Sequence, residues 1–260
     1  MNFIVCIKQV PGTTEIKIDP ETNTLVREGV ASIINPFDTY ALEEAVRLKE
    51  SVGDSKVTVI TMGPPQAEQA LREAISLGAD EAILLSDRVF AGSDTWATSY
   101  VLSKGMAKIG DYDLILLGKQ TLDGDTGQVG PGLSEMLRIP FVAYVSKVEE
   151  IKEGYIKVQR MIEEGYETFE MSLPAVITVS KEINVPRVPS LRGSMKAKTA
   201  TIPTWSAEDI GVEAEKAGIG GSPTRVVKIF FPKREQQSEM LQGTADEQTD
   251  QLVEKLSKIL

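Results

Sequence analysis

Glycines and carboxylates crowd one stretch of the chain, residues 118–137, which has the sequence GKQTLDGDTGQVGPGLSEML. The stretch follows directly on the apolar run DLILL at 113–117, so we expect it at a strand-to-helix junction. Glycine lets the backbone turn tightly and approach a ligand, and the free amides at a helix start can hold an anion. A nucleotide pyrophosphate fits this chemistry.

The stretch matches neither the P-loop pattern GxxxxGK[ST] nor the dinucleotide pattern GxGxxG. The sequence therefore gives little support for the interpretation that this protein is a common kinase or dehydrogenase. Asp123 and Asp125 would repel a bare phosphate, but as short acceptors they can bind ribose or ribityl hydroxyls, or brace the loop through its own amides. A long turn with no ligand is the alternative that the pattern leaves open.

The rest of the composition removes whole reaction classes. The chain has no histidine and one cysteine, Cys6. Ser-His-Asp and Cys-His catalysis and most zinc sites need imidazole, and one cysteine cannot build a disulfide framework or a four-cysteine iron–sulfur site. We therefore predict no catalytic residue and no metal site; any chemistry comes from a bound cofactor.

Length and charge indicate the class of protein. A chain of 260 residues with 42 % hydrophobic content can bury one α/β core and still carry an extension. The formal charge of -10, from 28 basic and 38 acidic residues, argues against nucleic acid as a partner. No apolar run has the length of a membrane span and no signal-peptide layout precedes the first apolar run, so we expect a cytoplasmic protein.

Short apolar runs alternate with helical patterns through the first half of the chain. The expected strands are 2–10, 56–62, 81–85 and 113–117, and the expected helices are 38–51, 66–77, 94–109 and 132–138. Asn35 or Asp38 can cap the first helix, and Ser93 or Asp94 the third. This order predicts an α/β fold with a doubly wound, mostly parallel sheet of the adenine-nucleotide-binding type.

Further segments complete the predicted organisation. Alternating runs at 15–26 predict an inserted β-hairpin, and extended pieces from 141 onward predict a meander. Residues 181–203 show no periodicity, which predicts a long loop. Residues 225–231 are predicted to form a strand, and residues 246–260 an amphipathic helix. The expected divisions are 1–180 for the nucleotide-binding domain, 181–204 for the loop, 205–231 for a return to the core, and 232–260 for a C-terminal arm.

Ligands of doubly wound sheets bind at the carboxyl ends of the strands. Junctions 6–11, 62–65, 86–94 and 118–131 are expected to meet at that edge.

A set of short motifs, in order along nearly the whole chain, carries a family resemblance. The motifs are Asn35-Pro36-Phe37, Gly118-Lys119-Gln120, Asp-Gly-Asp-Thr at 123–126, Gln128-Val129-Gly130, Leu173-Pro174-Ala175-Val176, Pro186-Arg187, Ser190-Leu191 and Met195-Lys196-Ala197-Lys198. Together they resemble the beta subunit of an electron-transfer flavoprotein.

The resemblance implies a heterodimer with an alpha subunit that carries one FAD and exchanges electrons with acyl-CoA dehydrogenase-type partners. In ordinary carriers of this family the beta subunit holds structural AMP. In the electron-bifurcating type it holds a second FAD, which takes hydride from NADH and sends one electron to ferredoxin or flavodoxin and the other to the alpha-subunit flavin.

The glycine-rich loop is similar to that of the bifurcating, FAD-binding type. Gly124 and Gly127 leave room where a pyrophosphate continues past its AMP half. Asp38 and the helix start at 93–95 also resemble the bifurcating pattern. The expectation is therefore FAD, with structural AMP as the alternative.

Cofactor-binding residues carry over position by position. The resemblance places Cys6, Asn35, Phe37, Asp38 and Met62 around the adenosine, Thr95 at the neighbouring helix start, and Gly118, Gln120, Thr121, Asp123, Gly124, Asp125, Thr126, Gly127, Gln128 and Val129 around the phosphates. Without a ligand, Cys6 and Met62 would be core residues, Asn35 a helix cap and Phe37 an apolar packing residue.

The segment 181–203 resembles the family's partner-recognition loop. Leu191 matches the leucine that anchors on a dehydrogenase, flanked by Arg187 and Arg192. The alternative is that Leu191 packs back onto its own domain. The C-terminal helix, with an apolar stripe of Leu252, Val253, Leu256 and Leu260, is expected to pack on the alpha subunit.

Two rival functions remain at this level. A stand-alone regulatory nucleotide-binding module would leave the basic segment and the C-terminal stripe without a role. A dehydrogenase acting alone lacks both a nucleotide fingerprint and a proton-transfer residue.

Overall fold

The computed structural model describes residues 1–12, 17–18, 25–26, 32–227 and 238–258. The chain divides into two compact units, Met1–Arg225 and Val226–Leu260. The expected hairpin lies partly in the described range, where β3 (Lys17–Ile18) pairs antiparallel with β4 (Leu25–Val26).

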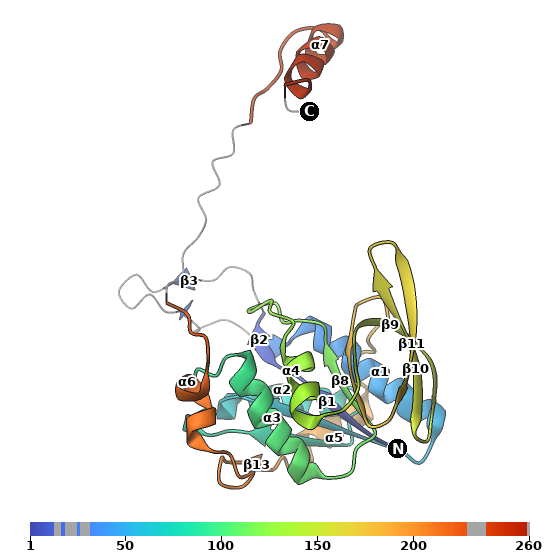
Figure 1. Cartoon of the computed structure of the whole chain (residues 1–260), viewed down its shortest axis with the longest axis vertical. Helices are drawn as coiled ribbons and strands as arrows, with labels where there is room; N and C mark the ends of the chain where they lie inside the picture. Colours follow the sequence, from blue (N-terminus) through green and yellow to red (C-terminus); the bar gives the residue numbers. More distant parts are fainter. Residues whose placement is uncertain (13–16, 19–24, 27–31, 228–237, 259–260) are drawn as a thin grey trace. The chain divides into compact units, whose positions relative to one another are not determined.

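One nine-stranded sheet forms the first unit (Figure 1), with the strand order β11-β10-β9-β12-β8-β1-β6-β7-β13. Its strands are β1 (Asn2–Cys6), β6 (Lys56–Met62), β7 (Glu81–Leu85), β8 (Leu114–Gly118), β9 (Phe141–Lys152), β10 (Tyr155–Ile162), β11 (Gly165–Ser172), β12 (Ala175–Val179) and β13 (Thr204–Trp205). All neighbours from β9 to β13 in this order pair parallel, and β9, β10 and β11 form the antiparallel meander. Strand order reverses between β1 and β8.

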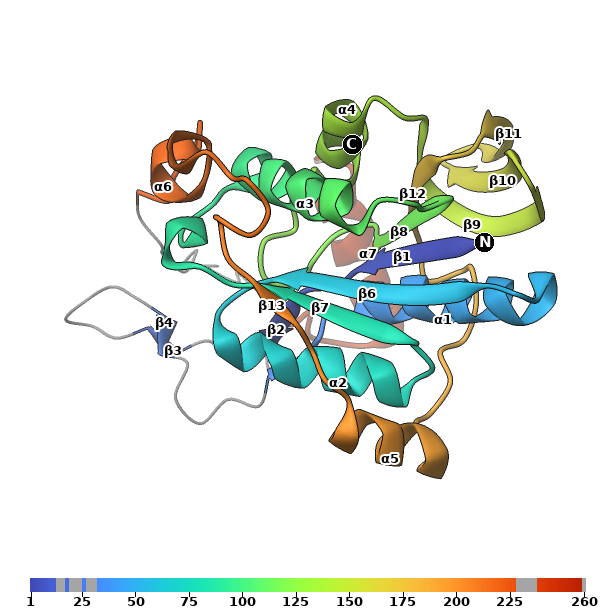
Figure 2. The ribbon, with the colours of Figure 1, turned by 90° about the horizontal axis from the view of Figure 1, so that it is seen from below.

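Helices cover both faces of the sheet (Figure 2), with α1, α2 and α5 on one side and α3 and α4 on the other. The helices of this unit are α1 (Pro36–Val52), α2 (Glu68–Ser76), α3 (Thr95–Ile109), α4 (Val129–Leu137), α5 (Leu191–Thr199) and α6 (Gly218–Gly221). The short 3-10 helices are η1 (Pro65–Ala67), η2 (Arg88–Phe90) and η3 (Ala214–Lys216). The predicted doubly wound, mostly parallel α/β fold is confirmed.

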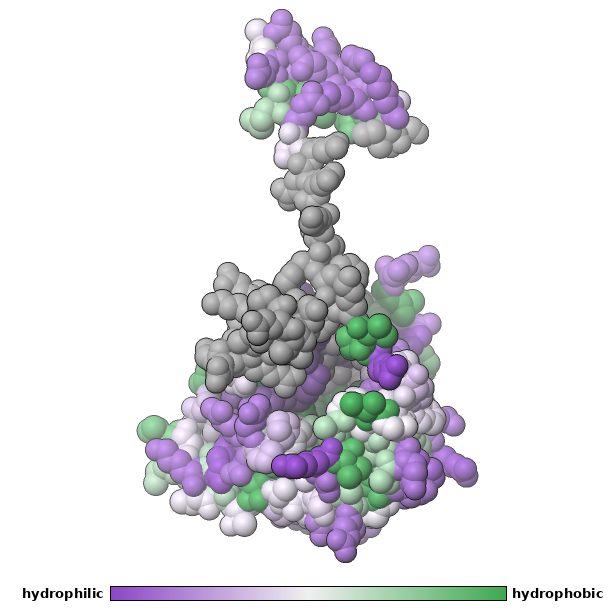
Figure 3. All heavy atoms as spheres, turned by 90° about the vertical axis from the view of Figure 1, so that its left-hand side faces the viewer, coloured by the Kyte–Doolittle hydropathy of each residue, from purple (hydrophilic) through white to green (hydrophobic). Residues whose placement is uncertain are grey.

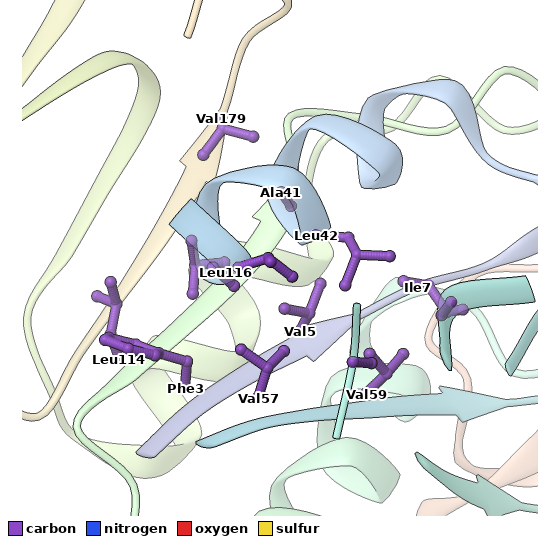
Figure 4. Packing of buried hydrophobic residues seen from close by; sticks show 14 of the residues in the cluster. Phe3, Val5, Ile7, Ala41, Leu42, Val57, Val59, Leu114, Leu116 and Val179 are labelled. Carbon is purple, nitrogen blue, oxygen red and sulfur yellow. The ribbon is translucent and has the colours of Figure 1, made fainter. Parts of the chain in front are cut away.

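The core lies in two layers, one on each face of the sheet. Side chains alternate along β1 and the residue after it, so that Phe3, Val5 and Ile7 join the layer beneath α1, and Ile4 and Cys6 join the opposite layer. Figure 4 shows the first layer from close by, where Val5 lies beneath Leu42 of α1 and Phe3 lies beside Leu114 of the neighbouring β8. Parallel strands buried on both faces need nearly continuous apolar sequences, which is what the short runs supply.

Two predicted elements differ in the structure. The single strand expected at 2–10 is divided into β1 and β2 (Gln9–Pro11), and β2 pairs with β5 (Ser32–Ile34) outside the main sheet. The chain leaves the main sheet at Lys8, whose backbone N–H donates to the carboxylate of Asp38 instead of to a strand.

The segment 181–203 is not simply a loop, because it contains helix α5. Ser190 caps α5 by accepting a hydrogen bond from the N–H of Gly193 at 2.9 Å. Arg72 of α2 donates to the carbonyl oxygens of Ala197 at 2.6 Å and Ala200 at 3.2 Å, which satisfies the end of the helix. Tertiary contacts therefore make a helix where the sequence has little amphipathic pattern.

The expected strand at 225–231 lies only partly within the described residues. Residues 225–227 are in no strand, and the remainder lies outside the described range.

The second unit contains α7 (Ala245–Leu256), which begins with a capping box between Thr244 and Glu247. Leu252, Val253 and Leu256 are exposed on it, and Leu260 lies outside the described residues. Figure 3 shows mostly hydrophilic atoms on this unit, with apolar ones gathered along one side. Within the described parts of the chain, no helix has the length and apolar character needed to cross a membrane.

Candidate functional site

The turn that begins α1 lies where the strand order reverses, and Asp38 is its buried centre. The carboxylate of Asp38 accepts hydrogen bonds from the N–H of Lys8 at 2.8 Å and from the N–H of Gly118 at 3.1 Å. It therefore joins the end of β1 to the end of β8. Burial raises the pKa of Asp38 to about 7, although both hydrogen bonds oppose that rise.

Asn35 occupies the N-cap position of α1, but its side chain makes no capping bond to that helix. Its Nδ2 donates to the carbonyl of Gln120 at 2.9 Å, and its Oδ1 accepts from the N–H of Leu122 at 3.2 Å. The side chain is fully buried. Asn35 and Asp38 therefore both hold the 118–128 segment through their polar atoms. That these two residues also contact the cofactor stays a prediction.

Protein groups also neutralise or bind the two loop carboxylates that could repel phosphate. The Nζ of Lys8 lies 2.8 Å and 2.7 Å from the two carboxylate oxygens of Asp123, and Gln120 donates through Nε2 to Asp125. Partial burial alone would raise the pKa of Asp123, but the hydrogen bond and charge of Lys8 outweigh it and the pKa is lowered. These contacts brace the loop through side chains of Lys8 and Gln120. Binding of ribose or ribityl hydroxyls by the two carboxylates stays a prediction.

The glycines of the loop serve different purposes. A Cβ at Gly118 would lie 2.5 Å from Oδ1 of Asp38 and 2.6 Å from the backbone carbon of Phe37, so Gly118 is required by close packing. Gly127 has a φ of +62°, which favours glycine. A Cβ at Gly124 would come no nearer than 3.5 Å to any atom, namely Oγ1 of Thr121. Protein packing therefore gives no reason for glycine at 124, whereas an approaching ligand would.

Helix α4 starts at the end of this loop, beside α3. Val129 is its first residue, and the Oγ of Ser99 in α3 donates to the Val129 carbonyl at 3.2 Å. A Cβ at Gly132 would lie 2.6 Å from Oγ of Ser99, so a small residue lets the two helices meet. Asp94 caps α3, as predicted, by accepting from the N–H of Ala97 at 3.0 Å. This brings Thr95, the first residue of α3, to the same edge of the sheet as Val129.

Cys6 and Met62 end adjacent strands at this edge. Cys6 is 5 % exposed, and burial raises its thiol pKa above the ordinary value, with the charge of Asp38 acting in the same direction. Met62 is half-buried against the same core layer. Cys6 is thus a core residue and Met62 packs against the core, and contact of either residue with the adenosine stays a prediction. The exposed residues Thr126 and Gln128 and the half-buried Thr121 complete the predicted set in the loop.

The sequence did not indicate side-chain contacts of three residues at this edge of the sheet: Lys8, Lys119 and Tyr144. The Nζ of Lys119 lies 5.1 Å from the ring centroid of Phe37 and 5.9 Å from that of Tyr144. Tyr144 has a φ of +59° within β9, beside a register shift against β12, and is 49 % exposed. Only the position of Lys8 at a strand end could have been noticed from the sequence.

The residues expected to dock a partner separate into two groups. Leu191 is 88 % exposed and Arg192 is also exposed, so Leu191 does not pack back onto its own domain. Arg187 instead donates to Glu43 through Nε at 2.8 Å and to Glu50 through Nη1 at 2.7 Å. Its guanidinium anchors the segment to α1, and a contribution of Arg187 to docking stays a prediction.

Among the described residues, no group of three or more cysteine, aspartate or glutamate side chains could hold a metal ion. The site therefore offers backbone amides at the start of α4, free space beside Gly124, and two carboxylates that are bonded to protein side chains. This arrangement suits an anionic nucleotide.

Comparison with known proteins defines the class. The electron transfer flavoprotein domain matches residues 22–210 of the chain. The chain belongs to the electron transfer flavoprotein family, as a beta subunit.

Relatives align over nearly the whole chain. The electron transfer flavoprotein subunit beta of Thermoanaerobacterium thermosaccharolyticum is 51 % identical over 258 residues, which are 99 % of this chain and 98 % of the relative. The caffeyl-CoA reductase-Etf complex subunit CarD of Acetobacterium woodii is 47 % identical over 259 residues, with 99 % and 98 % covered. Protein FixA of Azotobacter vinelandii is 46 % identical over 250 residues, with 94 % and 89 % covered.

Proposed function

We propose that this beta subunit holds FAD at the carboxyl edge of its sheet and takes part in electron bifurcation. The observation that carries the proposal is the open face of Gly124, between two carboxylates that already have partners. A Cβ there would meet no atom within 3.4 Å, while Lys8 and Gln120 bind Asp123 and Asp125. The loop can therefore approach a diphosphate closely with the charge of Asp123 compensated by Lys8 and with the carboxylate of Asp125 held by Gln120.

The residues present fit such a cofactor. The first N–H groups of α4, those of Val129 and Gly130, have no acceptor within the helix and favour a phosphate. Asn35 and Asp38 fix the loop that precedes this helix. Bound FAD would supply hydride and single-electron chemistry, because the described chain offers neither histidine nor a metal cluster.

The proposed electron path begins with NADH as donor. One electron goes to a low-potential acceptor, ferredoxin or flavodoxin, and the other to the FAD of the alpha subunit and from there to an acyl-CoA dehydrogenase-type enzyme. Support comes from the 47 % identical CarD of Acetobacterium woodii, a subunit of a caffeyl-CoA reductase-Etf complex. The contribution of this chain is to bind and orient the cofactor.

Two further surfaces are proposed for protein partners. The segment with Val185, Val188, Leu191 and Met195 is proposed to dock the dehydrogenase, because each of these apolar side chains is more than 70 % exposed. Helix α7 is proposed to pack on the alpha subunit through its exposed apolar stripe of Leu252, Val253 and Leu256.

The alternative, an ordinary carrier with structural AMP, uses the same edge of the sheet and differs in what occupies it. Acid extraction of the purified heterodimer followed by chromatography separates the two. We expect two FAD per heterodimer; one FAD with one AMP would contradict the proposal. Anaerobic titration with NADH, with and without ferredoxin, then tests the electron path, and flavin reduction without any ferredoxin-dependent step would contradict bifurcation.

A further inference from the structure

Lys8 has a backbone that is fixed on both sides at the point where the chain leaves the main sheet. Its N–H donates to Oδ2 of Asp38 at 2.8 Å, and its carbonyl accepts from the N–H of Asn35 at 2.8 Å. Because both partners belong to the buried turn that starts α1, the Lys8 side chain projects from a defined place.

The ammonium group of Lys8 reaches the glycine-rich loop, 115 residues later in the sequence. It contacts both oxygens of Asp123, at 2.8 Å and 2.7 Å. The preceding residue, Leu122, is held from the same turn by Oδ1 of Asn35 at 3.2 Å. The loop is thus attached at two adjacent residues, once by a buried amide and once by an ion pair.

The ion pair lies next to the glycine that faces open space. Asp123 directly precedes Gly124, so any change in the position of Asp123 moves the backbone that would meet the phosphates. The Lys8 side chain is 45 % exposed and that of Asp123 is 29 % exposed, so the pair lies at the surface beside the loop and is not part of the core.

We propose that Lys8 is a positioning residue of the nucleotide site, which holds the 118–128 segment through Asp123 in the shape that binds the cofactor's phosphates. This inference rests on the proposed function, because it concerns the same nucleotide. In this proposal, Lys8 affects cofactor affinity indirectly, by holding Asp123 in place. A lysine that bound phosphate directly would instead be released when Asp123 lost its charge.

The chain contains a matched control ion pair at the amino ends of β6 and β7, away from the carboxyl ends where the site lies. Lys56 and Glu81 form an ion pair at 2.6 Å, and the Lys56 side chain is 44 % exposed, close to the value for Lys8. Lys56→Met and Glu81→Gln therefore remove a comparable ion pair without touching the site.

The first test uses the full heterodimer stripped of nucleotide and titrated with FAD and with AMP. Lys8→Met and Asp123→Asn should each raise the dissociation constant by roughly three- to five-fold, as for a partly exposed ion pair. The double variant should be no worse than either single one, Lys8→Arg should retain affinity, and the control variants should match wild type. Tighter binding by Asp123→Asn with weaker binding by Lys8→Met would overturn the proposal, as would additive losses.

The second test needs no bound nucleotide. Hydrogen exchange of the nucleotide-free heterodimer should be faster at the amides of Leu122 and Asp125 in Lys8→Met than in Lys56→Met, because those amides are bonded within the held loop. Equal exchange in both variants would overturn the positioning role. If wild type bound neither FAD nor AMP, the proposed function would fail, while this exchange measurement would still decide the role of Lys8.

Discussion

The side-chain amide of the fully buried Asn35 donates to the carbonyl oxygen of the half-buried Gln120 at 2.9 Å, across 85 residues of sequence. Asn35 also accepts from the N–H of Leu122. A residue at a helix N-cap position thus determines the course of the loop that follows β8.

Replacing Asn35 by alanine should leave the carbonyl of Gln120 and the N–H of Leu122, two partly buried groups, without the partner that the Asn35 side chain supplies. The expected loss is about 1–3 kcal/mol of the free energy of unfolding, together with weaker nucleotide binding. Urea unfolding and nucleotide content measure the two effects. Asn2→Ala, at an exposed position, is the control; equal stability of Asn35→Ala and that control would contradict the assignment.

Asp38 should make stability depend on pH in an unusual direction for a carboxylate. Its pKa is about 7 in the folded chain and near 3.8 when unfolded, so between these values the folded chain holds the extra proton. The contribution of Asp38 to stability is therefore complete below pH 4 and decreases as pH rises to 7, by on the order of a few kcal/mol. Comparing wild type with Asp38→Asn from pH 4 to 8 isolates this slope, and a constant difference across the range would refute it.

Gly118→Ala should mainly lower the stability of the fold, whereas Gly124→Ala should mainly lower the affinity for FAD. The new Cβ at 118 would overlap Asp38 and Phe37, which costs about 1–3 kcal/mol of stability or more. The new Cβ at 124 has space in the protein, so stability should remain within about 0.5 kcal/mol of wild type while affinity for FAD falls. Unchanged affinity in Gly124→Ala would mean that the cofactor does not approach this residue.

Arg187→Ala should loosen the attachment of the docking segment to α1. The carboxylate of Glu43, only 6 % exposed, would lose the guanidinium of Arg187 and keep Arg47 at 3.4 Å and the backbone N–H of residue 187 at 3.1 Å. We expect a loss of about 1–3 kcal/mol in thermal or urea unfolding, smaller at high salt. Arg192→Ala, at an exposed position, should leave stability unchanged; an equal loss in both variants would argue against the anchoring role.

Leu191→Ala should affect partner docking without affecting the fold. Because the side chain is 88 % exposed, its truncation removes little buried surface from the chain itself. Electron delivery to the dehydrogenase should fall, whereas NADH-driven flavin reduction should be unchanged. If delivery rates were the same as for wild type at limiting dehydrogenase, Leu191 would not be a docking residue.

Local sequence patterns were sufficient for much of the sheet. The strands at 56–62 and 81–85 were predicted at their observed bounds, because buried parallel strands require compact apolar runs between turn residues. The interruption of the strand at 2–10 could not be predicted, since its cause is the Asp38 carboxylate 30 residues away. Helix α5 was missed for a similar reason: Arg72, more than 100 residues earlier, satisfies its last carbonyls.

Topology also explains why part of the site was predictable. Strand ends meet at one edge of a parallel sheet, so the glycine-rich loop and the turn at 35–38 could be expected to lie together. The sequence alone could not predict which polar side chains and backbone groups at this edge form hydrogen bonds or ion pairs with one another. The contact of Lys8 with Asp123 and the left-handed conformation of Tyr144 depend on bulges and turns that only the folded chain defines.

Strand β13 pairs with β7 at the last edge of the sheet, directly after the segment that carries Leu191. That segment leaves from β12 and ends at β13, so both of its ends are tethered to the same sheet. A partner that binds there would meet a surface whose backbone entropy has largely been lost on folding, and the cost of ordering it on association would be small. Lengthening either connector would consequently weaken association without removing a single contact residue.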